Sequence, residues 1–147
     1  MLPFKKILYP TDFSEASYEA LKAANELALH FSAELCLVHV VSPVVQASPD
    51  FAASVSSLQE VETSAEHSLQ KVVRQMVSKE LHARQIVKLG GAADEIIRIS
   101  EERKADLIVI ATHGETGWRH MVFGSVAEKV VRLAPCPVLT IRAPQKS

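Results

Sequence analysis

Glycines and a serine gather near the end of the chain in a pattern that suits a phosphate group. Nine residues separate Gly114 from Gly124-Ser125, the apolar run 107–110 precedes them, and an amphipathic helical pattern follows. Glycine lets backbone amides approach a ligand closely, and the amino end of a helix attracts negative charge. This order of strand, glycine-bearing loop and helix start predicts a nucleotide phosphate site at the end of a buried strand.

Ser125 has a second interpretation, as the cap of the helix that follows. Ser125 and Glu128 have the spacing of a capping box, in which the serine accepts a hydrogen bond from the amide three residues later. Glycines also serve ordinary turns. The loop is not a Walker A motif, because Gly-Lys-Ser/Thr does not occur, and Gly114-Glu-Thr-Gly117 lacks the spacing of a dinucleotide fingerprint. The residues alone do not decide between a phosphate-binding loop and a helix cap.

A second set of polar residues follows the first apolar run of the chain. Pro10 ends that run, and Thr11 and Asp12 then lie at the carboxyl end of the predicted strand. A carboxylate there can accept hydrogen bonds from a ribose hydroxyl or from the amino group of a base. The alternative is a helix cap, because Asp12 precedes Glu15 by three residues, and Ser14 is a competing cap.

Apolar runs and helical periodicity alternate along the whole sequence. Continuous apolar runs predict buried strands at residues 7–9, 35–41, 86–89, 107–110 and 138–141. Three- and four-residue spacing predicts helices within residues 16–31, 58–76, 93–100 and 127–134, and Ile97 is expected on the apolar face of the third. The order predicts one α/β domain over residues 1–147, a doubly wound Rossmann-like fold with a five-stranded parallel sheet and helices on both faces. Ligands bind such sheets beyond the carboxyl ends of the strands.

The segment at residues 42–57 does not fit a short connection. It contains Pro43, Pro49, Asp50 and several serines. It is predicted to be a loop that leads to the second helix, either as a flap over the site or as a surface excursion.

Composition narrows the function classes. A chain of 147 residues with 48% hydrophobic and 22% charged residues is typical of a soluble globular domain. The net charge of -1 gives no electrostatic reason to expect nucleic acid or a membrane surface as a partner. No apolar run approaches the roughly 20 residues that cross a bilayer. Pro10 and Asp12 interrupt the first apolar run, so no signal peptide is expected and the cytoplasm is the predicted location.

The sequence offers no set of residues for catalysis or for a resident metal. Cys36 and Cys136 are too few and too far apart for a disulfide framework or a zinc site, and each is expected to be a small buried residue. His39 is expected to be a hydrogen-bonded histidine at a strand end. His113 is expected to shape its loop rather than to act as a general base, because no nucleophile, base and orienting group occur together.

Several motifs, in this order along the chain, resemble the universal stress protein family: Tyr9-Pro10-Thr11-Asp12-Phe13-Ser14, His39-Val40, Gly114-x9-Gly124-Ser125 and Pro137-Val138-Leu139. The resemblance covers essentially the whole chain. The nucleotide-binding branch of that family carries Gly-x2-Gly-x9-Gly-Ser/Thr. Ala111 stands here in place of the first glycine, whereas Gly114, Gly124 and Ser125 match. The resemblance therefore implies an adenine nucleotide, ATP or AMP, as the ligand.

The same resemblance implies a role for each part of the site. Pro10, Thr11 and Asp12 would meet the adenosine, and backbone groups of Val40 would meet the adenine. Ribose and phosphates would be held by Ala111, Thr112, His113, Gly114, Gly124, Ser125 and Val126.

Glu115 departs from the family, in which Lys or Arg often follows this glycine. A carboxylate there repels phosphate unless it faces solvent or holds a divalent ion. Glu115 could therefore shift the preference toward AMP or ADP or weaken ATP binding, and Mg²⁺ or Mn²⁺ is the metal that could accompany the nucleotide. Arg119 and His120 are candidate cations of the same loop, and a solvent-facing role is the alternative for both.

The implied function is a regulator or sensor in the stress response rather than a dedicated catalyst. Two alternatives stay open: a slow metal-dependent ATPase, and a nucleotide-free dimeric interaction module. The last strand, Val138 to Ile141, is an apolar edge candidate, and such edges pair with other chains. The family also tends to dimerise through this strand, so a homodimer with two-fold symmetry is expected.

Overall fold

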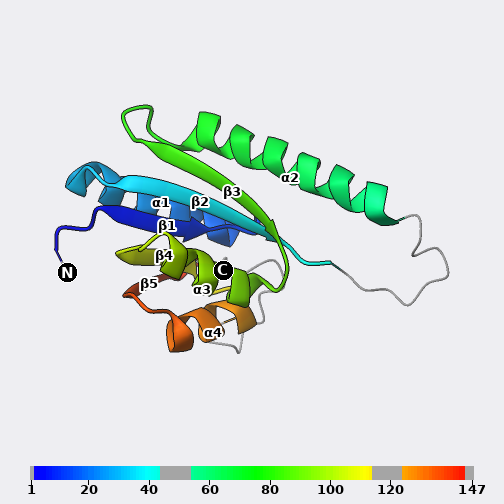
Figure 1. The fold of residues 1–147 in the computed structure, drawn as a ribbon. Helices are drawn as coiled ribbons and strands as arrows, with labels where there is room; N and C mark the ends of the chain where they lie inside the picture. Colours follow the sequence, from blue (N-terminus) through cyan, green and yellow to red (C-terminus); the bar gives the residue numbers. More distant parts are fainter. Residues whose placement is uncertain (1, 44–53, 114–123, 145–147) are drawn as a thin grey trace.

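Strands and helices alternate throughout the computed structural model, which describes residues 2–43, 54–113 and 124–144 (Figure 1). The predicted order of elements and the α/β class are confirmed. The elements are β1 (Lys6–Pro10), α1 (Glu15–Phe31), β2 (Glu34–Val41), α2 (Ser54–Met76), β3 (Ala83–Leu89), α3 (Ala92–Glu102), β4 (Leu107–Ala111), α4 (Ser125–Leu133) and β5 (Val138–Ile141).

The five strands form one parallel sheet in the order β3-β2-β1-β4-β5. The chain winds outward from β1 through β2 to β3, and then returns to the other side of β1 to add β4 and β5. The winding direction therefore reverses between β1 and β4, which is the place where doubly wound sheets open to a ligand.

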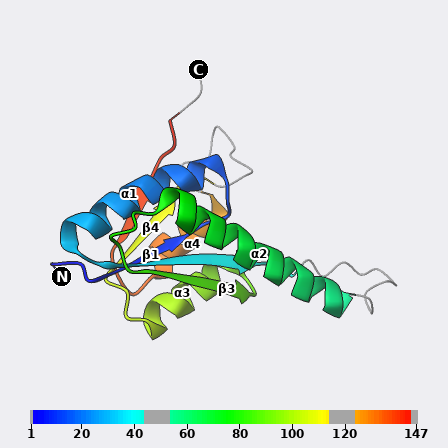
Figure 2. The ribbon, with the colours of Figure 1, turned by 90° about the horizontal axis from the view of Figure 1, so that it is seen from above.

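Two helices cover each face of the sheet. Alternate strand residues point to opposite faces, so Ile7 and Tyr9 pack under α1 and α2, whereas Leu8 packs under α3 and α4. Figure 1 and Figure 2 show this layering, and in both views the amino-terminal end of α2 projects beyond the sheet. Both faces of the central strands are buried, which explains their continuous apolar runs.

The structure corrects three details of the sequence prediction. The strand β1 continues through Pro10 instead of ending before it. In α3 the buried face contains Ile99, whereas Ile97 is only half-buried. Cys36 is buried as expected, but Cys136 is half-buried. Of the predicted loop at 42–57, residues 44–53 lie outside the described residues, and α2 already begins at Ser54.

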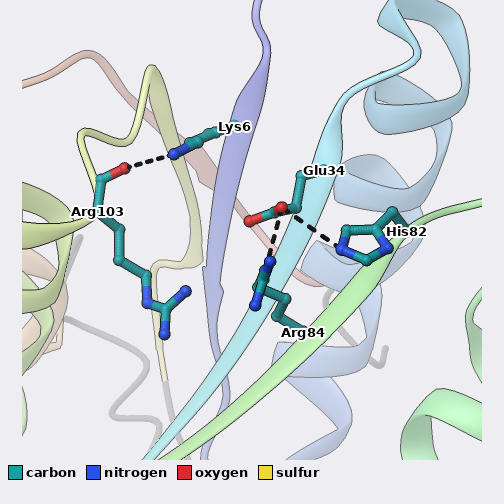
Figure 3. A network of polar contacts seen from close by, with 5 residues as sticks. All are labelled: Lys6, Glu34, His82, Arg84 and Arg103. Carbon is teal, nitrogen blue, oxygen red and sulfur yellow. Dashed lines mark hydrogen bonds and ion pairs between the residues drawn. The ribbon is translucent and has the colours of Figure 1, made fainter.

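Charged side chains gather at the amino ends of β1, β2 and β3 (Figure 3). Glu34 at the start of β2 forms ion pairs with Arg84 at 3.2 Å and with His82 at 3.7 Å. Lys6 donates a hydrogen bond to the carbonyl of Arg103 at 3.3 Å. These contacts hold the end of the sheet that faces away from the carboxyl ends of the strands. Within the described ranges, no helix is long and apolar enough to cross a membrane.

Candidate functional site

A cavity of about 320 Å³ lies at the carboxyl ends of β1, β2 and β4. Every predicted site residue that the structure describes lines it, and Gly114 lies outside the described residues, as do Glu115, Arg119 and His120. The lining residues are Pro10, Thr11, Asp12, Ser17, Val38, His39, Val40, Ala92, Ile96, Ile110, Ala111, Thr112, His113, Gly124, Ser125, Val126 and Ala127.

Pro10 helps to open the sheet at this point. The pairing of β1 with β4 runs only through Ile7 and Leu8, whereas its pairing with β2 continues to Pro10. The amide of Thr11 donates to Val38 on the β2 side, so the nitrogen of Pro10 faces the β4 side. Because proline has no N–H to donate, no ladder bond forms there and a gap is left between the two strands.

The strands on either side of β1, β2 and β4, turn their backbone toward the space beyond its carboxyl end. The carbonyl of Val41 accepts a hydrogen bond from the amide of Gly90, at the end of β3, and the amide of Thr112 donates to the carbonyl of Ile141 in β5. The backbone groups of successive strand residues point to opposite sides, so these bonds set the directions of the residues before them. That alternation directs the N–H and C=O groups of Val40 and Ala111 toward β1, beyond the last residues with which β1 pairs there. The two strand ends therefore offer backbone donors and acceptors to the cavity from both sides.

The start of α1 is stabilised by its own residues. Ser14 is the N-cap, and its hydroxyl oxygen accepts a hydrogen bond from the amide of Ser17 at 3.2 Å. Asp12 does not cap the helix; its Oδ1 accepts from the amide of Ser14 at 3.0 Å and from the Ser14 hydroxyl. The choice between the two predicted caps is thereby decided in favour of Ser14, and the exposed Asp12 carboxylate stays at the cavity.

A buried group of hydroxyls holds the turn before α1. The Ser17 hydroxyl donates its single proton to the carbonyl of Ser14 at 2.8 Å, so the Thr11 hydroxyl donates to Ser17 at 2.9 Å. The Thr11 Oγ1 also accepts from the amide of Phe13 at 3.0 Å. Below it, the Tyr9 hydroxyl donates to the carbonyl of Ser17 at 2.6 Å, and burial raises the pKa of Tyr9 to about 12.

The start of α4 is arranged in the opposite way. Its N-cap is Gly124, which makes no side-chain cap bond, and the amide of Glu128 donates to the Gly124 carbonyl at 2.9 Å. The capping-box interpretation of Ser125 is therefore wrong, because Ser125 is the first helical residue and not the cap. The amide of Gly124 donates to the Thr112 carbonyl. Ser125, Val126 and Ala127 line the cavity, and the amides of a helix's first turn have no partners within the helix.

The lining combines apolar walls with few polar groups. Val38, Val40, Ile96, Ile110 and Val126 supply apolar surface. Among the lining residues that the structure describes, Asp12 is the single carboxylate and none is Lys or Arg. Across the same described part of the chain, no group of three or more His, Cys, Asp or Glu side chains could hold a metal ion. Such a pocket suits a flat apolar ring with an anionic group at the α4 end.

Sequence reasoning missed the contribution of α3. Ala92 and Ile96 line the cavity, and this helix also begins at a glycine, Gly91, without a side-chain cap. A signal was present in Gly90-Gly91 directly after the third strand. Gly90 has φ +147°, and a Cβ there would lie 2.9 Å from Cγ of Glu95, so the turn requires glycine.

The histidines near the cavity lie in different surroundings. Nδ1 of His39 lies 2.8 Å from the carbonyl oxygen of Thr11, which confirms that His39 is hydrogen-bonded at a strand end. Nδ1 of His113 lies 3.0 Å from the Thr112 hydroxyl, and its loop-shaping role stays a prediction.

Comparison with known proteins finds one family over nearly the whole chain. The model of the universal stress protein family matches residues 3–142. Universal stress protein MJ0531 of Methanocaldococcus jannaschii is 37% identical over 145 residues, which cover 97% of this chain and 85% of that relative.

Solved structures agree with this match. The structure of MJ0577, a universal stress protein of the same organism, has a TM-score of 0.85 at 27% identity and covers 97% of this chain and 99% of its own. An Arabidopsis thaliana member of the family, solved with AMP bound, has a TM-score of 0.66 at 20% identity, with 95% and 92% covered, and shows the same fold.

Proposed function

Because the chain belongs to the universal stress protein family, we propose that its cavity binds an adenine nucleotide, ATP or AMP, and that the protein acts in the cytoplasm as a regulator or sensor of stress. The observation that carries the proposal is the pairing of two features around one apolar cavity. Asp12 lies at one side, and the amino end of α4, without a side-chain cap, lies at the other.

Each part of a nucleotide has a chemical counterpart in this arrangement. The apolar walls suit the adenine ring, and the backbone groups of Val40 can pair with its polar edge. The Asp12 carboxylate can accept hydrogen bonds from ribose hydroxyls or from the adenine amino group. The amides of Ser125 and Val126, together with the Ser125 hydroxyl, suit phosphate oxygens. The AMP bound to the Arabidopsis relative makes the same ligand class reasonable here.

The direct test is mass spectrometry of the purified protein after denaturation, followed by calorimetric titration with ATP and with AMP. We expect an adenine nucleotide close to one per chain, or saturable binding of added nucleotide by protein stripped of it. Asp12→Ala is expected to weaken binding of both nucleotides. If the protein carries no nucleotide and binds neither one at millimolar concentration, the cavity has another ligand. Incubation with Mg²⁺ or Mn²⁺ should leave bound ATP intact, whereas steady phosphate release would identify a slow ATPase.

We also propose a homodimer in which β5 pairs with β5 of a second copy. The two edges of the sheet differ in charge: β3 carries Arg84 and Lys88, whereas β5 carries no charged residue, and its Leu139 is 39% exposed. Charged residues protect an edge from pairing, and an uncharged apolar edge favours it. Light scattering at micromolar concentration should give twice the chain mass, and Leu139→Lys should give a monomer. A wild-type monomer under these conditions would contradict the dimer.

A further inference from the structure

We propose that His39 and Phe13 are positioning residues that hold the turn 11–14, and thereby Asp12, ready for the nucleoside half of the ligand. The inference rests on the proposed nucleotide site and adds to it the two side chains that shape its nucleoside end. Neither residue has to touch the ligand, because both act through the backbone on either side of Asp12.

His39 is anchored to this turn by a directional contact. A carbonyl oxygen only accepts hydrogen bonds, so Nδ1 of His39 carries the proton that it donates to Thr11 at 2.8 Å. The ring also packs on Phe13, with 4.5 Å between ring centroids and 36° between the planes. One side chain from the end of β2 therefore contacts the residue before Asp12 and the residue after it.

Phe13 adopts a backbone conformation that needs such support. Its φ is +64°, in the left-handed region that bulky side chains rarely occupy. Conformations of this kind persist where the surroundings determine them, and they gather at functional sites. Here the Phe13 amide donates to Thr11 Oγ1, and its side chain packs on the core beneath α1.

The consequence for Asp12 is a carboxylate placed before any ligand arrives. The peptide groups on both sides of it are held, and its Oδ1 is fixed by the amide and hydroxyl of Ser14. A side chain that is already in its binding position loses little freedom when it binds, which favours affinity. Loss of the His39 contact lets the turn relax, so part of the free energy of nucleoside binding is then used to order the turn again.

The two contacts of His39 can be separated by substitution. His39→Asn places an N–H donor on the same branch of the side chain as Nδ1 but removes the ring. His39→Phe keeps a ring against Phe13 but removes the donor, and His39→Ala removes both. Calorimetry with adenosine and with ATP then measures each contribution, and the thermal midpoint of every variant reports folding.

We expect His39→Ala to weaken adenosine and ATP by the same factor, about tenfold, because the loss lies in the half that the two ligands share. His39→Asn should recover most of this affinity, to within about threefold of the wild type, whereas His39→Phe should recover less. Val72→Ala, in the core between α2 and the sheet, is the matched control: it lowers the thermal midpoint but should leave both affinities unchanged.

The inference is wrong if His39→Ala binds adenosine as tightly as the wild type does. It is also wrong if the affinity of His39→Ala falls only in proportion to its thermal midpoint; in that case Val72→Ala should lose affinity in the same proportion. It is equally wrong if His39→Asn recovers nothing. In each of these cases wild-type binding, and with it the proposed function, is unaffected. A wild-type protein that binds neither adenosine nor ATP contradicts the proposed function itself.

Discussion

Helices α1 and α4 both begin at the cavity, and their first turns are satisfied in different ways. At α1 the Ser14 hydroxyl caps the helix, Asp12 braces Ser14, and the Tyr9 hydroxyl anchors the carbonyl of Ser17 from below. At α4 the cap is Gly124, which makes no side-chain cap hydrogen bond to the helix amides. A helix start that satisfies itself has few donors left for a ligand, so we expect the phosphates of the proposed nucleotide at α4 and not at α1.

The conformation of Gly124 sharpens this difference. Its φ of -66° and ψ of 161° are accessible to every residue, so the backbone itself does not require glycine. Serine, threonine, aspartate or asparagine at this position would cap the helix better. The close approach of a phosphate in the proposed nucleotide site would explain a glycine at this position, whereas Gly90 is required by its own backbone.

Gly124→Asp should turn the start of α4 into one that resembles α1. The new carboxylate would cap the helix and would repel phosphate from the same space, so we expect ATP affinity to fall by at least about 100-fold. The thermal midpoint should stay the same or rise, because the cap improves. Calorimetry and thermal unfolding of the same samples check both halves, and unchanged ATP affinity would place the phosphates elsewhere.

Alkaline pH should loosen the anchor of α1. Burial raises the pKa of Tyr9 from its ordinary value of 10.0 to about 12, so the folded state holds this proton more tightly than the unfolded chain does. The stabilisation is complete below about pH 10 and is lost as the pH rises toward 12, by at most about 2.7 kcal/mol. Urea unfolding at a series of pH values measures the decline.

Tyr9→Phe is the control for this titration. Its free energy of unfolding should fall less steeply above pH 10 than that of the wild type. A smaller decline that begins near pH 9 should remain, because burial also raises the pKa of Cys36 to about 11. Equal slopes in the two proteins above pH 10 would show that the phenol does not contribute.

Ser14→Ala should lower stability, because this serine caps α1 and also braces Asp12. Loss of such a cap costs about 1 kcal/mol of unfolding free energy. Chemical denaturation at neutral pH measures the change. A stability equal to that of the wild type would mean that the start of α1 does not depend on its side-chain cap. The difference between the starts of α1 and α4 would then have no effect on stability.

Ser125→Ala is the matched change at the other helix and should have the smallest effect on folding. Ser125 is exposed and caps nothing, so the free energy of unfolding should change by less than about 0.5 kcal/mol. ATP affinity should fall by about fivefold through loss of one hydroxyl contact to phosphate, while adenosine affinity stays constant. Weakening of both ligands alike would move Ser125 away from the phosphates.

Much of the architecture could be predicted from local patterns. The strands are buried on both faces, so their apolar runs are continuous, and the helix faces repeat at helical spacing. The candidate site residues could be chosen because parallel strands end at one edge of the sheet. Ala92 and Ile96 were missed because Gly90-Gly91 signals only a turn after the third strand, whereas the contribution of α3 depends on how that helix lies across the sheet.

The sequence by itself determined the elements, their order and the strand ends that carry Asp12, Val40 and the glycines, because propensity and periodicity are local properties. Tertiary structure alone decided which serine caps a helix: Ser14 does, and Ser125 does not, because the amide of Gly124 is drawn back to the Thr112 carbonyl and the helix begins one residue after the glycine. It also brought the ring of His39 onto Phe13 across 25 intervening residues, a contact that exists only because β2 pairs beside β1.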